Sequence, residues 1–258
     1  MVTKTRAGIV AGLAVLFVAG CGGDDSEARP EPGLEVIDAD APQLVFDDPC
    51  AAVADFEFDM IDDFDPGDDS DEIGMSQWTN TDGSATEFDY SFREPLEGER
   101  CENDADDERV AYIHARGLAE YGGAFGGSFT LRDVSDWTGL SLWVRAAPES
   151  QGRTLFVGIN SPKTDTSSWN EGGEAYCDDL SVIEAEKCDR FGGSIQLTER
   201  WQLVTLPFDR MKQRAFGVKV EQPELDQVTG INIGFEAVDW DIYVDEVAFY
   251  RPRTPAED

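Results

Sequence analysis

The sequence predicts an all-β protein built as a two-sheet antiparallel β-sandwich, and three observations support this fold class. First, the apolar segments are short, rich in β-branched and aromatic residues, and separated by Gly, Asn, Asp and Pro. Second, several segments alternate between apolar and polar residues, which is the period of a strand with one buried face. Third, amphipathic helical periodicity is almost absent, and no heptads or longer repeats occur. Two antiparallel sheets packed face to face account for this pattern.

Residues 1–20 form the first element of the chain. Lys4 and Arg6 precede an uncharged apolar run that ends at Gly20, directly before Cys21. The run is shorter than the ~20 residues that a helix needs to cross a bilayer, and its layout is typical of a secretory signal peptide. The small residues before Cys21 resemble a bacterial lipobox, so we expect lipidation of Cys21 after cleavage. The alternative is an ordinary signal peptide followed by an incidental cysteine.

Residues 21–49 are rich in Asp, Glu, Pro and Gly and poor in aromatic residues. Such a segment buries too little apolar surface to offset its ordering entropy, so we expect an extended acidic tether. Its short apolar patch, Leu44-Val45-Phe46, is expected to dock on the domain that follows. Residues 50–252 are predicted to form that domain, and residues 253–258 a tail.

Six segments of the domain have the clearest strand character. Two others, Ala51–Asp59 and Leu180–Lys187, are expected to form at most single short helices. Along the strands, apolar and polar residues point to opposite faces, as in Leu140–Arg145, where the leucines share one face. The predicted strands are Arg109–Ala115, Leu140–Arg145, Thr154–Asn160, Trp201–Phe208, Gly230–Glu236 and Asp241–Tyr250.

The charge of the chain excludes two classes of partner. Residues 1–20 hold two of the 20 Lys and Arg residues and none of the 54 acids, so cleavage leaves 18 cations and a formal charge of −36. A surface this acidic repels nucleic acid and anionic lipid, which need a basic footprint. Attachment to a membrane must therefore come from acyl chains on Cys21. Gly22 at the next position favours an outer-membrane over an inner-membrane location in the cell envelope.

The four cysteines other than Cys21 are an even set in an oxidising compartment, which favours disulfides. Three pairings are possible in principle. The short spacing of Cys177 and Cys188 favours a local bridge, and Cys50 would then pair with Cys101. Zinc is the alternative use of four thiols, but the spacing CxxC does not occur.

Five segments, taken in order, resemble a known family. They are IDDFDPGD (61–68), HARGLAEYGGAFGGSF (114–129), DVSDWTGLSLWVRA (133–146), FGGSIQLTERWQLVTLPFDRM (191–211) and GINIGFEAVDWDIYVDEVAFY (230–250). They resemble the jelly-roll carbohydrate-binding modules of the galactose-binding-like fold, in particular family 11 modules and similar domains of myxobacterial-type lipoproteins. The resemblance covers most of residues 55–251 and implies a non-catalytic module that binds a polysaccharide or glycan.

The same resemblance implies a structural calcium ion near the first and last strands. Its ligands would be Asp62 or Asp63 together with Asp245, since carboxylate oxygens suit Ca²⁺. Acids are so common in this chain that a chance placement is the competing explanation.

The candidate glycan site follows from strand alternation. Sugar recognition needs flat aromatic rings and planar polar groups, and residues 112, 114 and 116 project from one face of a strand. Two further pairs would extend this face if their strands lie in the same sheet. The candidate ligand-binding residues are Tyr112, His114, Arg116, Trp143, Arg145, Asn232 and Glu236. A Trp in a sandwich strand is more often a packing residue, and Trp78, Trp169 and Tyr176 are the alternative stacking residues.

Nothing in the sequence indicates an active site. His114 is the single histidine, and no G-x-S-x-G motif presents a serine, which disfavours nucleophilic triads. Glycosidase chemistry needs only two carboxylates, and 54 acids supply such pairs by chance. We expect a lipid-anchored, non-catalytic glycan-binding protein. The alternatives are a structural or adhesive envelope lipoprotein that binds protein, and a glucan-active protein associated with cellulases.

Overall fold

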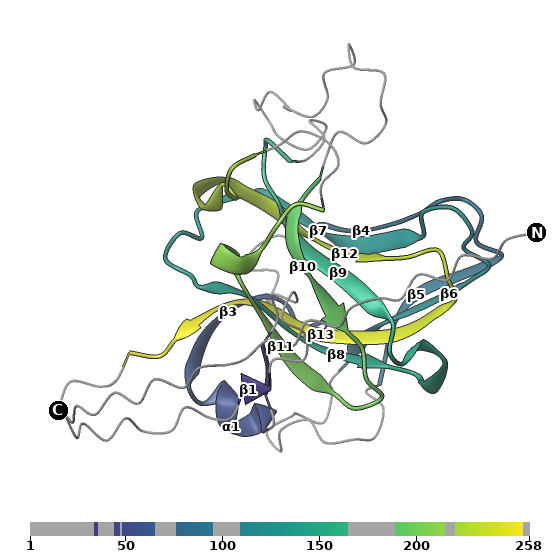
Figure 1. Cartoon of the computed structure of the whole chain (residues 1–258), viewed down its shortest axis with the longest axis horizontal. Helices are drawn as coiled ribbons and strands as arrows, with labels where there is room; N and C mark the ends of the chain where they lie inside the picture. Colours follow the sequence, from purple (N-terminus) through teal and green to yellow (C-terminus); the bar gives the residue numbers. More distant parts are fainter. Residues whose placement is uncertain are drawn as a thin grey trace, which may run out of the picture. The chain divides into compact units, whose positions relative to one another are not determined.

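The computed structural model describes residues 34–35, 44–46, 48–64, 76–94, 109–164, 189–214 and 220–254 (Figure 1). Within these ranges no helix is long and apolar enough to cross a membrane. The sequence predictions for six residues lie outside the described part of the chain: Cys21, Cys101, Trp169, Tyr176, Cys177 and Cys188.

The described strands form two antiparallel sheets, as the sequence predicts (Figure 1). The eight-stranded sheet has the order β1 (Leu34–Glu35), β2 (Leu44–Phe46), β11 (Gln202–Pro207), β8 (Gly139–Ala146), β13 (Trp240–Pro252), β6 (Val110–Arg116) and β5 (Glu87–Arg93), with β3 (Phe56–Asp62) also paired to β13. The five-stranded sheet has the order β10 (Phe191–Gln196), β9 (Thr154–Asn160), β12 (Val228–Phe235), β7 (Gly123–Arg132) and β4 (Ser76–Thr81).

The described helices are short connectors, namely α1 (Pro49–Val53) and the 3₁₀ turns η2 (Pro148–Ser150), η4 (Phe208–Arg210) and η5 (Leu225–Gln227). The expected helix over Ala51–Asp59 is therefore wrong in its second half, where β3 begins at Phe56. Pairing with the long strand β13 stabilises this segment as a strand. The other expected helix, Leu180–Lys187, lies outside the described residues. All six predicted strands are present: Thr154–Asn160 has the predicted ends, and the ends of the other five are shifted by one or two residues.

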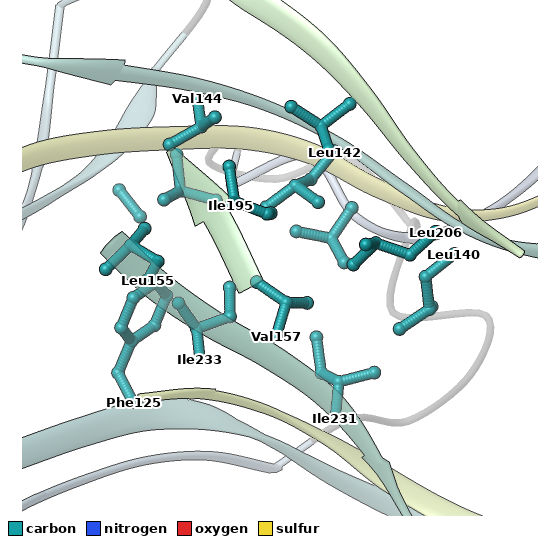
Figure 2. Close-up of a cluster of buried hydrophobic side chains, with 14 of the residues drawn as sticks. Phe125, Leu140, Leu142, Val144, Leu155, Val157, Ile195, Leu206, Ile231 and Ile233 are labelled. Atoms are coloured by element: carbon teal, nitrogen blue, oxygen red, sulfur yellow. The ribbon is translucent and has the colours of Figure 1, made fainter. Parts of the chain in front are cut away.

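The main core lies between the inner faces of the two sheets. Figure 2 shows Leu140, Leu142 and Val144 of β8 pointing toward Val157 of β9 and Ile231 of β12. All five side chains are at most 2% exposed. The alternation seen in the sequence of β8 therefore places its apolar residues in the core, as predicted.

A second apolar cluster covers part of the outer face of the eight-stranded sheet. Phe46, Val53 and Phe56 pack against a group that includes Trp143 and Leu203. The Leu44–Phe46 patch docks on the domain as expected, because β2 pairs with β11. The N-terminal strap, which we define as residues 44–56, therefore contributes to the folded unit.

Helix α1 of the strap begins at an Asp48 cap. The Asp48 carboxylate accepts a hydrogen bond from the Ala51 amide at 3.0 Å, and Pro49 occupies the first helical turn. Cys50 is disulfide-bonded. Its partner lies outside the described residues, so the pairing with Cys101 stays a prediction.

A β-bulge at Glu246 allows β13 to pair with two different strands along the same edge. Residues 240–244 pair with β6, and residues 247–252 pair with β3, while β8 occupies the opposite edge. Glu246 has φ 44°, and the bulge keeps Val244 and Val247 both in the core on either side of it.

Candidate functional site

The structure divides the sequence-predicted ligand residues between the two sheets. Asn232 lies on β12 of the five-stranded sheet, and Glu236 is exposed directly after that strand. The other five lie at positions of β6 and β8 that point away from the main core, namely Tyr112, His114, Arg116, Trp143 and Arg145. The seven residues therefore do not form one surface. Alternation shows which face of a strand is polar, but it does not show which sheet the strand joins.

On the outer face of the eight-stranded sheet, Asp241 of β13 is the centre of a polar network. Its carboxylate accepts short hydrogen bonds from the Tyr112 hydroxyl and from an Arg116 nitrogen. Nδ1 of His114 lies 2.8 Å from the same carboxylate, and Nε2 lies 3.3 Å from Glu87. The Asp241 side chain is 5% exposed, so its charge is compensated almost entirely by these neighbours.

This network shifts the pKa values of its members in opposite directions. Burial alone would raise the pKa of Asp241, but hydrogen bonds from Tyr112, Arg116 and His114 outweigh it and lower the pKa to about 2. The hydrogen bond with Asp241 raises the pKa of His114 above its ordinary value, against a smaller opposing effect of burial. Burial, and then the bond to Asp241, raises the pKa of Tyr112.

The aromatic side chains of this face pack against neighbouring side chains and are not exposed to solvent as flat surfaces. The Tyr112 and Tyr243 ring centroids lie 4.9 Å apart, and the Arg93 guanidinium lies 3.6 Å from the Tyr112 centroid. Trp143 is 2% exposed and Trp201 is 6% exposed beneath the strap. These residues hold the sheet and the strap together and leave little ring surface for a ligand.

The outer face of the five-stranded sheet has a different character. A row of directly opposed residues crosses all five strands and ends at Lys212, which forms an isolated bridge with Gly192 of β10. We call this row the glycine trough. Residues directly opposite one another in antiparallel strands lie on the same face, and here it is the face away from core residues Ile231 and Ile233. From one edge to the other, the trough consists of Lys212, Gly192, Gly158, Asn232, Gly126 and Trp78.

Two glycines of the trough, Gly192 and Gly158, lie where the backbone is closely approached. A Cβ on Gly192 would lie 2.6 Å from the Phe156 ring and 2.3 Å from a backbone oxygen. A Cβ on Gly158 would lie 2.6 Å from the Phe191 carbonyl oxygen. Gly within a strand weakens the strand and marks places where a ligand or another group comes close to the backbone. Gly234, beside the trough, has more room, because a Cβ at this position would have no neighbour closer than 3.5 Å.

Two cation-bearing pairs flank the trough. The Arg214 guanidinium lies 4.2 Å from the Phe156 ring centroid on one side. On the other side, the Arg190 Nε donates a short hydrogen bond to Asn160 Oδ1. Both pairs combine an apolar or amide surface with a planar guanidinium, which can bind hydroxyl or carboxylate oxygens.

Asn232 is the polar residue at the middle of the trough. It is 4% exposed, and its side chain makes no hydrogen bond to any residue that the structure describes. Its amide offers two donors and one acceptor in a row that otherwise consists mostly of glycines.

A rigid loop presents one further aromatic residue at the end of the same sheet. Tyr121 is 65% exposed, and its hydroxyl donates to the Thr81 carbonyl oxygen at 3.3 Å. The Asp82 carboxylate accepts hydrogen bonds from the amides of Glu120, Tyr121 and Gly122 at 2.9–3.1 Å. An exposed ring held in this way is a preorganised stacking surface.

Two short repeated sequences indicate the glycine trough, although the alternation within any single strand does not reveal it. The tetrapeptide FGGS occurs twice, at 125–128 and 191–194, and the tripeptide GIN occurs at 158–160 and 230–232. At a period of two, each copy places glycine or asparagine on the face opposite its apolar residues. Trp78, one of the alternative stacking residues predicted from the sequence, lies opposite Gly126 at the edge of the row.

The described acids do not gather into a metal site. Within the ranges that the structure covers, no three His, Cys, Asp or Glu side chains are close enough to hold a metal ion. Asp62 accepts hydrogen bonds from the Phe64 amide at 2.8 Å and from Gln77 at 2.5 Å, and Asp245 accepts one from the Glu246 amide at 2.8 Å. The calcium ion with Asp62, Asp63 and Asp245 as ligands stays a prediction.

Comparisons with known proteins find similarity at the level of structure only. No protein-family model matches the chain, and no curated protein sequence matches it. Similar solved structures include the family 11 carbohydrate-binding module of the cellulosomal cellulase Lic26A-Cel5E of Clostridium thermocellum, with 13% identity, a TM-score of 0.47, and coverage of 75% of this chain and 94% of that one.

Two more structures illustrate the range of these similarities. The Clostridium thermocellum family 11 module in complex with a β-1,3-1,4-mixed-linked tetrasaccharide has 14% identity, a TM-score of 0.48, and coverage of 74% and 94%. The family 30 module of the same organism's cellulase Cel9D-Cel44B has 8% identity, a TM-score of 0.39, and coverage of 69% and 92%. Similarities of this degree identify neither a ligand nor a binding site for this chain.

Proposed function

We propose that this protein is a non-catalytic carbohydrate-binding protein that holds a glycan chain in the glycine trough. The observation that carries the proposal is the register row itself, in which three glycines and one buried asparagine, without a partner among the described residues, lie side by side across the sheet. Six positions at the ordinary strand spacing span about 24 Å, which is long enough for an extended oligosaccharide.

The residues around the trough supply the two kinds of contact that sugars need. Planar polar groups bind hydroxyls in pairs, and Asn232 at the centre and Arg190 and Arg214 at the sides are such groups. Aromatic rings cover the apolar C–H faces of a sugar, and Tyr121 offers an exposed ring at the end of the sheet. The outer face of the eight-stranded sheet is less suited, because Tyr112 and Arg116 bind Asp241 and the strap packs over part of this face.

Glycan binding by substituted full-length protein tests the proposal. We expect Asn232→Ala to lower the affinity for the best ligand of a glycan array by about fivefold or more, because a ligand hydrogen bond is lost. Gly234→Leu is expected to block the trough without a backbone clash, since a Cβ at this position would meet its neighbours at ordinary contact distances of 3.5 Å or more. Glu87→Gln, a change to a 70% exposed side chain on the other sheet, is the control and should leave affinity unchanged.

The opposite result would reject the trough. If Glu87→Gln lowers affinity while Asn232→Ala and Gly234→Leu do not, the ligand binds the eight-stranded sheet instead. If the unsubstituted protein binds no glycan, the proposed function fails, and binding of protein by an adhesive envelope lipoprotein becomes the better interpretation.

We further propose that Cys21 carries the lipid that anchors the protein in the cell envelope, in the outer membrane. The support is the lipobox-like sequence before Cys21 and the Gly at position 22. Cys21→Ser should leave the protein in the soluble or unprocessed fraction after cell fractionation. Mature protein that still sediments with membranes after this change would contradict the proposal.

A further inference from the structure

Strand β5 forms one end of the eight-stranded sheet. Among the strands that the structure describes, it pairs with β6 alone, and the register runs without a shift from Glu87 to Arg93. A strand at the end of a sheet has a second row of backbone N–H and C=O groups that can pair with another chain. β5 contains no Pro, Lys or β-bulge, which are the features that commonly protect such an edge. It is therefore a candidate for pairing with a strand of a second chain.

Solvent reaches the side chains at both ends of β5. The exposed fraction of the side chain is 70% for Glu87 at the first position and 47% for Arg93 at the last. Phe92 is 41% exposed, although Phe88 and Tyr90 on the same face of the strand pack against the main core. Adding a second strand along this edge would remove apolar surface of Phe92 from water, which favours pairing.

The sequence of β5, EFDYSFR, is complementary to itself in the antiparallel direction. If two copies pair about Tyr90, Glu87 of each copy lies opposite Arg93 of the other. In the same register, Phe88 of each copy lies opposite Phe92 of the other. Opposite charges and aromatic pairs at directly opposed positions stabilise an antiparallel sheet, whereas like charges there destabilise it. This register pairs the whole strand, and a shift of two residues in either direction pairs fewer residues.

The charged residues at the ends of β5 already have partners within the chain, and these partners are compatible with pairing. Arg93 donates from Nη2 to Asp89 at 3.0 Å and from Nε to Ser91 at 3.4 Å. A guanidinium carries more N–H groups than these two bonds use. The bond to Asp89 compensates the acid that would lie closest to the two-fold axis. One oxygen of Glu87 lies 3.3 Å from His114 Nε2, and the carboxylate is still mostly exposed.

We propose that two copies of this chain associate through their β5 strands, across a two-fold axis at Tyr90, and form one continuous antiparallel sheet. The interface is isologous, so the two Glu87–Arg93 pairs form together. The inference goes beyond glycan binding, because β5 belongs to the eight-stranded sheet and the glycine trough to the other sheet. The net charge of the chain opposes association of two copies, so we expect a reversible dimer of low affinity.

Sedimentation equilibrium of the full-length chain carrying Cys21→Ser, in which acyl chains cannot drive association, tests the inference. We expect a monomer–dimer equilibrium at about 0.15 M salt. Arg93→Glu and Glu87→Arg each place like charges at both ends of the interface, and each should raise the dimer Kd by about tenfold or more. The double variant Glu87→Arg/Arg93→Glu should restore the dimer, because it exchanges the two charges. Arg200→Glu, at the exposed β10–β11 turn, changes the net charge as Arg93→Glu does and is the control.

Hydrogen exchange is a second measurement, and it needs no substitution in β5. The amides of residues 87–93 should exchange more slowly as the protein concentration is raised, whereas those of β10 in the other sheet should not change. A chain that stays monomeric up to millimolar concentration would overturn the inference. A dimer whose Kd ignores Arg93→Glu, or responds equally to Arg200→Glu, would show that β5 is not the interface. Single variants that weaken the dimer without restoration in the folded double variant would contradict the proposed register and overturn the inference as well.

Discussion

Asp82 illustrates how a single carboxylate can organise two loops of this protein. It accepts hydrogen bonds from the Ser84 amide and hydroxyl and from the amides of residues 120–122. The bond from Ser84, with the backbone bonds, lowers the pKa of Asp82 despite an opposing effect of burial. Asp241 has the same role inside a sheet, where it joins β13 to β6 through three side chains of that strand.

Asp82→Asn should lower the thermal midpoint at neutral pH by a few degrees, because an amide accepts these hydrogen bonds less well than a carboxylate. A carboxyl group with a lowered folded-state pKa contributes stability above its unfolded pKa of about 4 and loses it as the pH falls toward the folded value. The midpoints of the wild type and variant should therefore converge progressively below about pH 4. A difference between them that stays constant in acid would contradict this role.

His114 predicts a pH dependence of opposite sign. Its pKa is raised in the folded protein by the bond to Asp241, so its contribution is complete below its unfolded pKa of about 6.5. That contribution is lost as the pH rises through the higher folded value. Between about pH 6 and 9, His114→Gln should show a flatter change of melting temperature than the wild type. Since the imidazole is partly exposed, we expect the difference to be small, and parallel profiles would contradict it.

At the scale of elements, the N-terminal strap packs on one of the two outer faces of the sandwich. It pairs through β2 with β11 and packs α1 and Phe56 over the outer face of the eight-stranded sheet. The five-stranded sheet carries the glycine trough on its own outer face. If the trough binds a glycan as proposed, binding and strap packing depend on different residues and can be altered separately.

Trp143→Ala tests this separation. Trp143 is buried under the strap, so its truncation should lower the free energy of unfolding by about 3 kcal/mol or more. Glycan affinity should be unchanged below the melting transition, since the trough lies in the other sheet. Phe92→Ala is the matched control, because Phe92 is 41% exposed and its loss should cost below about 1 kcal/mol. A loss of affinity in folded Trp143→Ala protein would place the ligand on the eight-stranded sheet.

The elements also show how far sequence reasoning reaches in this chain. Alternation in Leu140–Arg145 was sufficient to predict the strand and the face that lies in the main core, but it left open that Trp143 on the opposite face is buried in the second apolar cluster. It was not sufficient to predict that β12 joins β7 and β9, because partner choice depends on contacts between residues distant in sequence. The predicted extension of the Tyr112 face to Asn232 required both strands to lie in one sheet, and they lie in different sheets.

At the scale of the whole molecule, the net charge acts against folding. A formal charge of −34 concentrates like charges when the chain becomes compact, which opposes folding. Salt weakens this repulsion, because it shortens the range over which the charges act.

The melting temperature of the full-length protein should therefore rise with NaCl. The screening length falls from about 30 Å at 0.01 M to about 3 Å at 1 M, so repulsion among surface carboxylates weakens over this range. We expect a rise of several degrees near neutral pH, measured by differential scanning calorimetry. The rise should shrink near pH 4, where many carboxylates are protonated and the repulsion is already reduced. A melting temperature that is unaffected by salt at neutral pH would show that the acids are spaced too widely to oppose folding.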